Sequence, residues 1–400
     1  MAKIDFDIAA PRRRGSGSYK WDSQAPGGVD RADIIPLWVA DMDFYTAPCI
    51  IEALRRRVDH GVFGYTLVPD SYYQALSGWF SRRHGYTIRR ESVIYVPGVV
   101  PAISAIIKAL THPGDGVIVQ TPVYNCFFSS IRNNGCSIVR NPLVRKELPD
   151  GSFTFVMDFA SLERLAHDPA NRILLLCNPH NPVGRAWTRT ELEEVARICR
   201  RHGVTVVSDE IHCDLTLPGH EFVSYGSLAS EYTSEAIICN SPSKAFNTAG
   251  LQIANIVCGN ESLRTLVDRA VNDNEVCDVN PFGVAGLIAA YTEGEEWLTQ
   301  LVAYLNANWQ WLSSYLRREL PFLPFAALEA TYLAWVDVSS LGIPSEELEN
   351  LLVKECGVWL NAGEMYGDDG YMRINFACPR ARLVEAMERL TPVLKRLHGC

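Results

Sequence analysis

The sequence predicts an α/β fold built on a mostly parallel sheet, followed by a smaller α+β region. Two observations lead to this prediction. Between about residues 92 and 260, short apolar runs that suit strands alternate with segments that suit helices. These runs are continuously apolar rather than alternating, which is typical of strands that helices cover on both faces.

The composition narrows the class of protein. The chain has 400 residues, of which 48% are hydrophobic and 21% charged, as in an average soluble domain. Its formal net charge of −9 gives no electrostatic footprint for nucleic acid or an anionic membrane. It contains no run of about 18 apolar residues, and its 12 cysteines include no Cys-x-x-Cys pair. We therefore expect free thiols, no metal site and a cytoplasmic location.

The elements follow from apolar spacing and end signals. Residues 1–45 are irregular but contain a dense apolar segment. Pro48 starts a predicted helix, because Ile51, Leu54 and Val58 recur three and four positions apart. Helices are also predicted at 102–110 and 191–202. Strands are predicted at 93–96, 116–120, 173–177, 204–208, 236–239 and 253–257.

The last third of the chain has a different pattern. Helical spacing is present over 294–319, 345–356 and 380–397, whereas residues 371–376 alternate with a period of two. This predicts a small α+β domain that packs with the N-terminal segment. The predicted boundaries are 1–47 for that segment, 48–290 for the large domain and 291–400 for the small domain.

Polar residues follow several predicted strands, where open α/β sheets bind ligands. Lys244 comes directly after one strand; a partly desolvated ammonium there would have a lowered pKa and could act as a nucleophile. The alternative is a solvated lysine in a turn. Asp209 ends another strand, and a buried carboxylate needs a cationic partner such as a protonated ring nitrogen. The alternative is a helix cap.

Four further features could bind parts of a ligand. Residues 97–101 precede a helix, whose free N–H groups can bind an anion. The turn that contains Asn181 could hydrogen-bond a ring oxygen, although Asn-Pro marks turns generally. Tyr124 could stack on a planar ligand or simply pack. Arg373 faces away from Met372 and Ile374, so it could clamp a carboxylate or form a surface ion pair.

Together and in this order, these residues resemble the fold-type I pyridoxal-phosphate enzymes of the aminotransferase class I/II family. The resemblance covers nearly the whole chain and implies a seven-stranded sheet in the large domain. Three N-terminal segments, residues 17–22, 36–44 and 61–66, look like the MalY/PatB group of cystathionine β-lyase-like C–S lyases. The residues that carry the wider resemblance are Gly98, Val99, Val100, Tyr124, Asn181, Asp209, His212, Ser241, Ser243, Lys244 and Arg373.

The resemblance implies roles around pyridoxal 5′-phosphate. Lys244 would attach the cofactor and remove the substrate's Cα proton, while Asp209 would pair with the pyridine nitrogen. Asn181 would bind the phenolic oxygen, and Tyr124 would stack on the ring. His212 stands where many aminotransferases have a tyrosine, so it would contact the ring or orient Asp209.

It also implies a phosphate site, a substrate site and a dimer. The phosphate would bind the N–H groups of Val99 and Val100 and the hydroxyls of Ser241 and Ser243. Tyr65 would reach it from a neighbouring subunit, which makes the expected state a homodimer with shared sites. Arg373 would bind the substrate carboxylate, and Trp38 would line the pocket. Gln252 departs from the family pattern, because many aminotransferases have a phosphate-binding arginine there.

The expected function is therefore a C–S β-lyase. It would cleave L-cystathionine or related cysteine S-conjugates to a thiol, pyruvate and ammonia. Two alternatives stay open from the sequence. One is an aminotransferase of the same fold, and the other is a lyase that also binds a transcription regulator.

Overall fold

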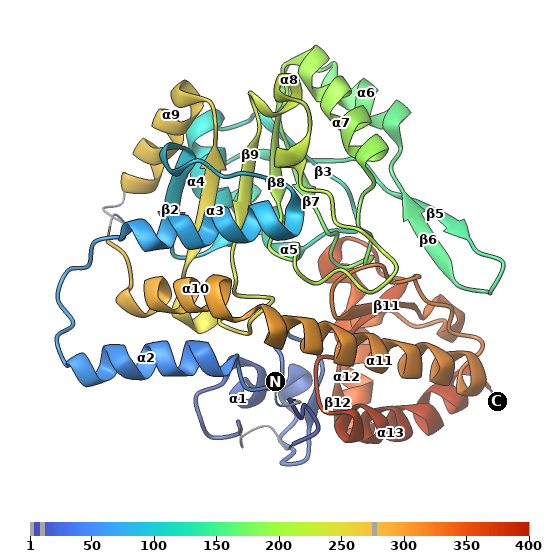
Figure 1. Ribbon diagram of the computed structural model, residues 1–400. Helices are drawn as coiled ribbons and strands as arrows, with labels where there is room; N and C mark the ends of the chain where they lie inside the picture. Colours follow the sequence, from blue (N-terminus) through green and yellow to red (C-terminus); the bar gives the residue numbers. More distant parts are fainter. Residues whose placement is uncertain (1–3, 9–12, 274–277, 400) are drawn as a thin grey trace.

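A seven-stranded sheet forms the centre of the protein (Figure 1). The computed structural model describes residues 4–8, 13–273 and 278–399. In spatial order the strands are β2 (Val93–Val96), β10 (Ala254–Cys258), β9 (Ile237–Asn240), β8 (Thr205–Asp209), β7 (Asn171–Cys177), β3 (Gly116–Val119) and β4 (Ser137–Arg140). Strand β10 runs antiparallel to both of its neighbours, and the other neighbouring pairs are parallel. The predicted fold class is confirmed.

Helices cover both faces of this sheet, which explains the continuous apolar runs. Successive side chains of a strand point to opposite faces. In β7, Ile173 and Leu175 belong to a core shared with α4 (Val99–Leu110), α5 (Asn125–Asn133) and α9 (Glu261–Asn272). Leu174 and Leu176 belong to a second core shared with α6 (Phe159–Ala166) and α7 (Arg189–His202). Both faces of the strand are therefore apolar.

The structure corrects three details of the sequence analysis. Strand β4 was not predicted, because it lies at the sheet edge and both of its end residues are exposed. Helix α4 begins at Val99 rather than 102, since Pro101 is tolerated in a first turn. Helix α7 begins at Arg189, where Thr188 and Glu191 form a reciprocal capping box.

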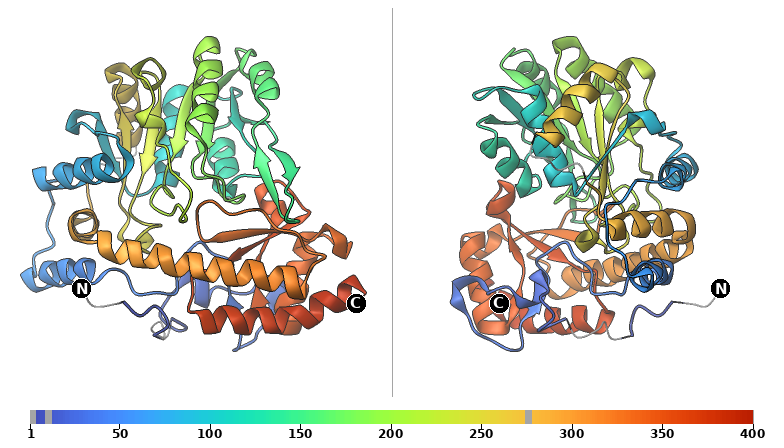
Figure 2. Two further views of the ribbon diagram at one scale, coloured as in Figure 1. Left: turned by 45° about the vertical axis from the view of Figure 1, so that its right-hand side comes forward. Right: turned by 90° about the vertical axis from the view of Figure 1, so that its left-hand side faces the viewer.

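The C-terminal region forms a second, smaller sheet of β11 (Leu333–Asp337), β14 (Tyr371–Asn375) and β13 (Asn361–Ala362). Its long helices are α11 (Glu295–Glu319), α12 (Ser345–Cys356) and α13 (Arg380–His398). Figure 2 shows α11, the long orange helix, extending from below the large sheet to the C-terminal region. The remaining elements are α1 (Tyr19–Asp22), β1 (Ile35–Pro36), α2 (Pro48–His60), α3 (Asp70–His84), β5 (Val144–Glu147), β6 (Phe153–Val156), α8 (Ser230–Thr233), α10 (Pro281–Glu293) and β12 (Val358–Trp359), with 3-10 turns η1 (Pro26–Gly28), η2 (Arg90–Ser92), η3 (Tyr225–Ser227), η4 (Ala249–Leu251), η5 (Ser339–Leu341) and η6 (Gly363–Tyr366).

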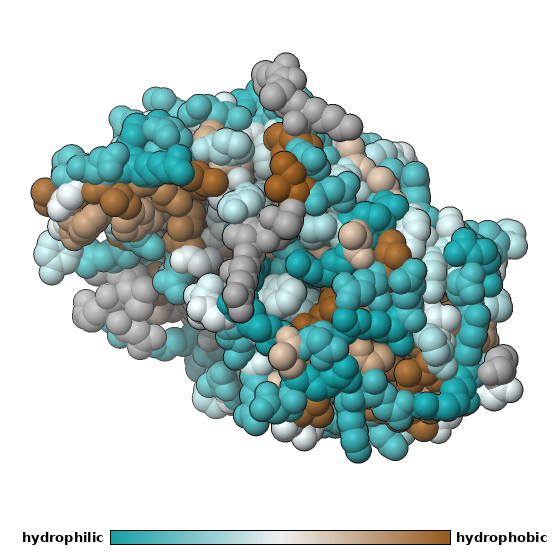
Figure 3. Space-filling model, turned by 90° about the horizontal axis from the view of Figure 1, so that it is seen from below, coloured by the Kyte–Doolittle hydropathy of each residue, from teal (hydrophilic) through white to brown (hydrophobic). Residues whose placement is uncertain are grey.

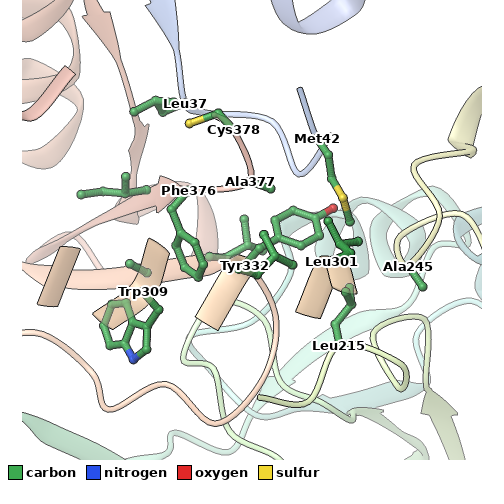
Figure 4. Packing of buried hydrophobic residues seen from close by; sticks show 14 of the residues in the cluster. Leu37, Met42, Leu215, Ala245, Leu301, Trp309, Tyr332, Phe376, Ala377 and Cys378 are labelled. Atoms are coloured by element: carbon green, nitrogen blue, oxygen red, sulfur yellow. The ribbon is translucent and has the colours of Figure 1, made fainter. Parts of the chain in front are cut away.

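The N-terminal segment is joined to the C-terminal region. Strand β1 pairs in parallel with β12, and the Leu37 N–H donates to the Trp359 carbonyl at 2.8 Å. One large core then mixes residues of both ends of the chain (Figure 4), with Met42 near Tyr332 and Leu301. The exact domain boundaries stay a prediction.

None of the helices in the described residues combines the length and the apolar character that crossing a bilayer requires. The ten cysteines of that part of the chain are all free thiols. The cytoplasmic location itself stays a prediction.

A buried ion cluster fixes the N-terminal segment. The Asp43 side chain is fully buried and lies 3.0 Å from Arg13, 3.2 Å from Lys20 and 3.0 Å from Arg382. The Trp21 Nε1–H also donates to it at 2.9 Å. Burial opposes the charged form, but Lys20 and Arg382 together hold the pKa of Asp43 below its usual value. The carboxylate is therefore the shared counter-ion of three cations.

Replacing Asp43 by asparagine should destabilise the protein strongly. The change leaves the fully buried Lys20 ammonium without its counter-ion, so we expect a loss of about 3–5 kcal/mol in the free energy of unfolding. Urea unfolding would measure it. The matched control is Asp33→Asn, because Asp33 pairs with Arg31 and Arg389 at a half-exposed site and should cost less than about 1 kcal/mol. Equal, small losses in both variants would contradict the analysis.

Candidate functional site

A cavity of about 430 Å³ opens at the carboxyl ends of the parallel strands. Its lining comes from the loops after β3, β7, β8 and β9, from the start of α4 and from the C-terminal region. Every predicted site residue except Tyr65 contributes to this lining. These residues are Trp38, Val99, Val100, Tyr124, Asn181, Asp209, His212, Ser241, Ser243, Lys244 and Arg373.

Lys244 reaches the cavity from the turn that follows β9. Its side chain is half-buried, and its Nζ donates to the carbonyl oxygen of Ala40 at 2.9 Å. Burial, reinforced by the nearby Arg373 cation, lowers the pKa of Lys244. The amine therefore becomes neutral, and able to act as a base or a nucleophile, at a lower pH than an exposed lysine.

Asp209 is a buried carboxylate without a cationic partner among the described residues. It ends β8, and its Oδ1 accepts the N–H of Ile211 at 3.1 Å. Burial raises its pKa to about 7, against smaller effects of that N–H and of Lys244. Among the described residues it forms no ion pair. Such a carboxylate suits a ligand that brings its own positive charge, for example a protonated ring nitrogen.

His212 lies three residues further along the same loop. It is buried, and burial together with Lys244 and Arg373 lowers its pKa, so the ring is neutral. Its Nδ1 has no hydrogen-bond partner in the described part of the chain. The edge of its ring lies against Tyr332, with centroids 6.1 Å apart. His212 therefore has an unused polar atom in the cavity wall.

Arg373 and Asn181 are joined across the cavity. The Arg373 guanidinium donates to Asn181 Oδ1 at 3.1 Å and to the Trp38 carbonyl at 2.8 Å. Its charge lies over the Tyr366 ring, 4.8 Å from the centroid. Its Nε is buried and has no partner among the described residues. The predicted alternative of a surface ion pair is wrong, because this arginine is only 3% exposed.

One end of the cavity offers donors for an anion. Helix α4 begins at Val99, so the first-turn N–H groups of Val99 and Val100 have no partner within the helix. Ser243 lies close by, with its hydroxyl 2.9 Å from that of Ser241. The Ser241 hydroxyl donates a hydrogen bond to the Ile253 carbonyl at 2.7 Å. The Ser243 hydroxyl is therefore the one that can donate to a bound anion.

Tyr124 precedes α5 in the cavity wall, and burial raises its pKa well above the usual value. Tyr65 lies elsewhere: its side chain is 95% exposed in the segment between α2 and α3. The expectation that it acts in a neighbouring subunit stays a prediction.

Gln252 is also exposed and does not line the cavity. This position therefore brings no cation to the end of the cavity that offers donors for an anion.

Residues 38–42 form a roof segment over the cavity, whose lining includes Trp38, Val39 and Ala40. The sequence analysis named Trp38 as a lining residue but missed the backbone contacts of this segment. The Asp41 side chain pairs with Arg13 at 2.6 Å and Trp38 stacks on Trp359, and three carbonyl oxygens of the segment accept hydrogen bonds from other parts of the chain. That of Trp38 accepts from Arg373, that of Ala40 accepts from Lys244, and that of Asp41 accepts from Lys20 and Asn375. Backbone acceptors of this kind carry no signal in residue type.

A second titratable cluster lies outside the cavity lining. Asp214 accepts from Trp79 Nε1 at 3.1 Å and lies 2.9 Å from His84 Nε2 and 3.3 Å from Arg83 Nε. Cys213 lies beside them, and ligand atoms of His84, Cys213 and Asp214 fall within 4.8 Å of one another. Because protein donors already occupy both Asp214 oxygens, we read this cluster as an anchor for the loop after β8.

Comparisons with known proteins agree with this arrangement. The family model described as aminotransferase class I and II matches residues 32–390. Cystathionine beta-lyase PatB of Bacillus subtilis (strain 168) is 40% identical over 394 residues, covering 98% of this chain and all of that protein. Protein MalY of Escherichia coli (strain K12) is 34% identical, covering 96% of this chain and 98% of its own.

A solved structure shares the same fold. Cystalysin from Treponema denticola, whose crystal structure contains a pyridoxal 5′-phosphate cofactor, superposes with a TM-score of 0.93. It is 33% identical, and the match covers 98% of this chain and 99% of that one. Matched over nearly all of its length, the chain belongs to the aminotransferase class I and II family.

Proposed function

We propose that the protein is a pyridoxal-5′-phosphate-dependent C–S β-lyase. Its substrate would be L-cystathionine or a related cysteine S-conjugate, which reacts with water to give a thiol, pyruvate and ammonia. The observation that carries the proposal is the meeting of the Lys244 amine, the uncompensated Asp209 carboxylate and the Arg373 guanidinium in one cavity. The named relatives support it, since PatB is called a cystathionine beta-lyase and cystalysin contains this cofactor.

The cavity residues fit the cofactor. Its volume of about 430 Å³ suits a small ligand. Asp209 would accept the protonated ring nitrogen, and Tyr124 would stack on the ring. Asn181 and His212 would face the phenolic oxygen. The phosphate would lie at the N–H groups of Val99 and Val100 and at the Ser243 hydroxyl, with Ser241 orienting Ser243.

When bound, the cofactor supplies an electron-withdrawing ring that acidifies the substrate's Cα–H and allows a thiolate to leave from Cβ. Lys244 would hold the cofactor covalently, and its Nζ, once freed, would take the Cα proton. Its lowered pKa makes the neutral amine available for both tasks. The same Nζ can return that proton to the departing sulfur.

Asp209 and Arg373 set the charge around this step. Asp209 would keep a proton on the ring nitrogen of the cofactor, because a buried carboxylate stabilises a neighbouring cation. Arg373 would bind the substrate's α-carboxylate through its free Nε, which fixes the Cα–H bond relative to Lys244. The stacked Trp38 and Trp359 rings, 4.1 Å apart, would close the substrate side of the cavity.

The proposed assembly is a homodimer. An apolar surface gathers at the end of the molecule where α2 lies (Figure 3). The segment after α2 exposes Val62, Phe63, Tyr65 and Leu67, with Leu67 91% exposed. Large exposed apolar groups on one segment favour burial against a partner. Docking of this segment against a second copy would bring Tyr65 toward the partner's phosphate site.

A product assay tests the function. Wild-type enzyme with L-cystathionine should release pyruvate, ammonia and homocysteine in equal amounts. Lys244→Ala should lower this rate by more than about 10³-fold without altering the far-ultraviolet circular dichroism. Borohydride reduction should fix the cofactor to wild-type protein but not to the variant. Amino transfer to a 2-oxo acid without pyruvate release would instead favour the aminotransferase.

The stability of the cofactor-free protein should depend on Asp209 and on pH. With a folded-state pKa of about 7, this group binds a proton between about pH 4 and 7 that the unfolded chain has released. Its contribution therefore makes the free energy of unfolding fall as pH rises. Asp209→Asn should exceed wild type by roughly 2–4 kcal/mol at pH 8 and by much less at pH 5. Glu388→Gln, at an exposed site on α13, is the control; a pH-independent difference would contradict the assignment.

The oligomer can be tested at Tyr65. Light scattering after size exclusion should give twice the chain mass for wild type. Tyr65→Phe removes only a hydroxyl from a 95% exposed side chain, so it should keep the dimer while weakening cofactor affinity about tenfold. Tyr19→Phe, an exposed tyrosine of the cavity mouth, is the comparison. A monomeric, fully active wild type would refute the shared site.

A further inference from the structure

A second hollow adjoins the cavity at Met365, which lines both spaces. This groove, of about 470 Å³, is lined by Phe128, Arg132, Arg140, Glu346, Glu364 and Met365, among others. Two elements run through both spaces. Helix α5 and its N-cap line the cavity at residues 124–126 and the groove at Phe128 and Arg132, and Met365 of η6 lines both. A ligand that leaves the cavity past Met365 therefore enters the groove.

The two walls of the groove carry opposite charge. Arg132 of α5 and Arg140 of β4 lie on the wall of the large sheet, whereas Glu346 of α12 and Glu364 of η6 lie on the opposite wall. All four are exposed, and none of them forms an ion pair within the described residues. Glu349 differs, because its oxygens accept from Trp359 Nε1 at 2.6 Å and from the Ala362 N–H at 3.2 Å.

Unpaired charges of both signs around one groove match a dipolar ligand. An α-amino acid group offers a carboxylate to the guanidinium groups and an ammonium to the glutamates. A simple anion would meet the glutamates, and a simple cation would meet the arginines, so neither is favoured by both walls. An alkyl group would gain little from either wall.

We propose that the groove binds the amino-acid end of the leaving thiol, so that the preferred substrates are S-conjugates with an amino-acid group at each end. The inference rests on the proposed lyase function and deepens it. Arg373 would hold the reacting end in the cavity, Met365 would lie beside the thioether chain, and Arg132 with Glu364 would hold the distal end. L-Cystathionine is a substrate of this kind, and S-butyl-L-cysteine is its counterpart without the distal charges.

The test compares these two substrates in the holoenzyme. The quantity measured is the ratio of kcat/KM for L-cystathionine to kcat/KM for S-butyl-L-cysteine. Arg132→Gln and Glu364→Gln should each lower this ratio, by roughly tenfold for loss of one charge-assisted contact. The matched control is Arg172→Gln, an exposed arginine at the start of β7, at the end of the sheet remote from the cavity, which should leave the ratio unchanged.

A binding measurement gives a second readout that does not depend on turnover. The probe is 2,7-diaminosuberate, in which a methylene replaces the sulfur of cystathionine and nothing can be expelled. Calorimetric titration should show weaker binding of this probe in Arg132→Gln, by a similar factor, and unchanged binding of 2-aminooctanoate, which lacks the distal amino-acid group.

The outcomes separate the two proposals. If wild type releases pyruvate from both substrates but the groove variants leave the substrate ratio and the probe affinity unchanged, the groove assignment is wrong and the lyase function stands. If wild type releases pyruvate from neither substrate, the lyase function fails and the groove assignment falls with it. A ratio that falls equally in Arg172→Gln also overturns the assignment, because the effect would then follow net charge alone.

Discussion

The charge cluster around the fully buried Asp43 carboxylate is the interaction on which the site depends. Its carboxylate pairs with Arg13, Lys20 and Arg382, which come from the N-terminal segment and from α13. These ion pairs fix the neighbouring roof segment, residues 38–42, against the C-terminal region. The carbonyl oxygens of that segment then orient Lys244 and Arg373. One shared counter-ion therefore connects the fold of the two chain ends to the position of the reacting groups.

Burial is the second constraint, and it shifts the pKa values of acidic and basic groups in opposite directions. It raises the pKa of Asp209 and lowers the pKa of Lys244 and His212. In every case the neutral form is favoured, because a low-dielectric surrounding penalises charge. A cavity with these groups suits a ligand that carries charge of both signs. Pyridoxal 5′-phosphate, with a protonated ring and an anionic phosphate, supplies both.

The sequence predicted the parts of the fold whose signal is local. The strands of the large sheet could be found because both of their faces are buried, which gives continuous apolar runs. Strand β4 could not, since an exposed edge strand lacks such a run. The polar residues after the strands could be named because parallel strands end at one edge of the sheet. The roof contacts could not, because the Ala40 carbonyl acts through the backbone, and any residue type provides one.

The pairing of β1 with β12 has a consequence for biosynthesis. Residues Ile35 and Val358 are neighbours in this pair, although more than three hundred residues separate them along the chain. Translation delivers the N-terminal segment first and its docking partner among the last residues to leave the ribosome. The large sheet has all of its strands by Cys258, well before that partner exists. Completion of the cavity therefore comes at the end of synthesis, because the strand that docks the N-terminal segment and the Arg373 guanidinium are both made late.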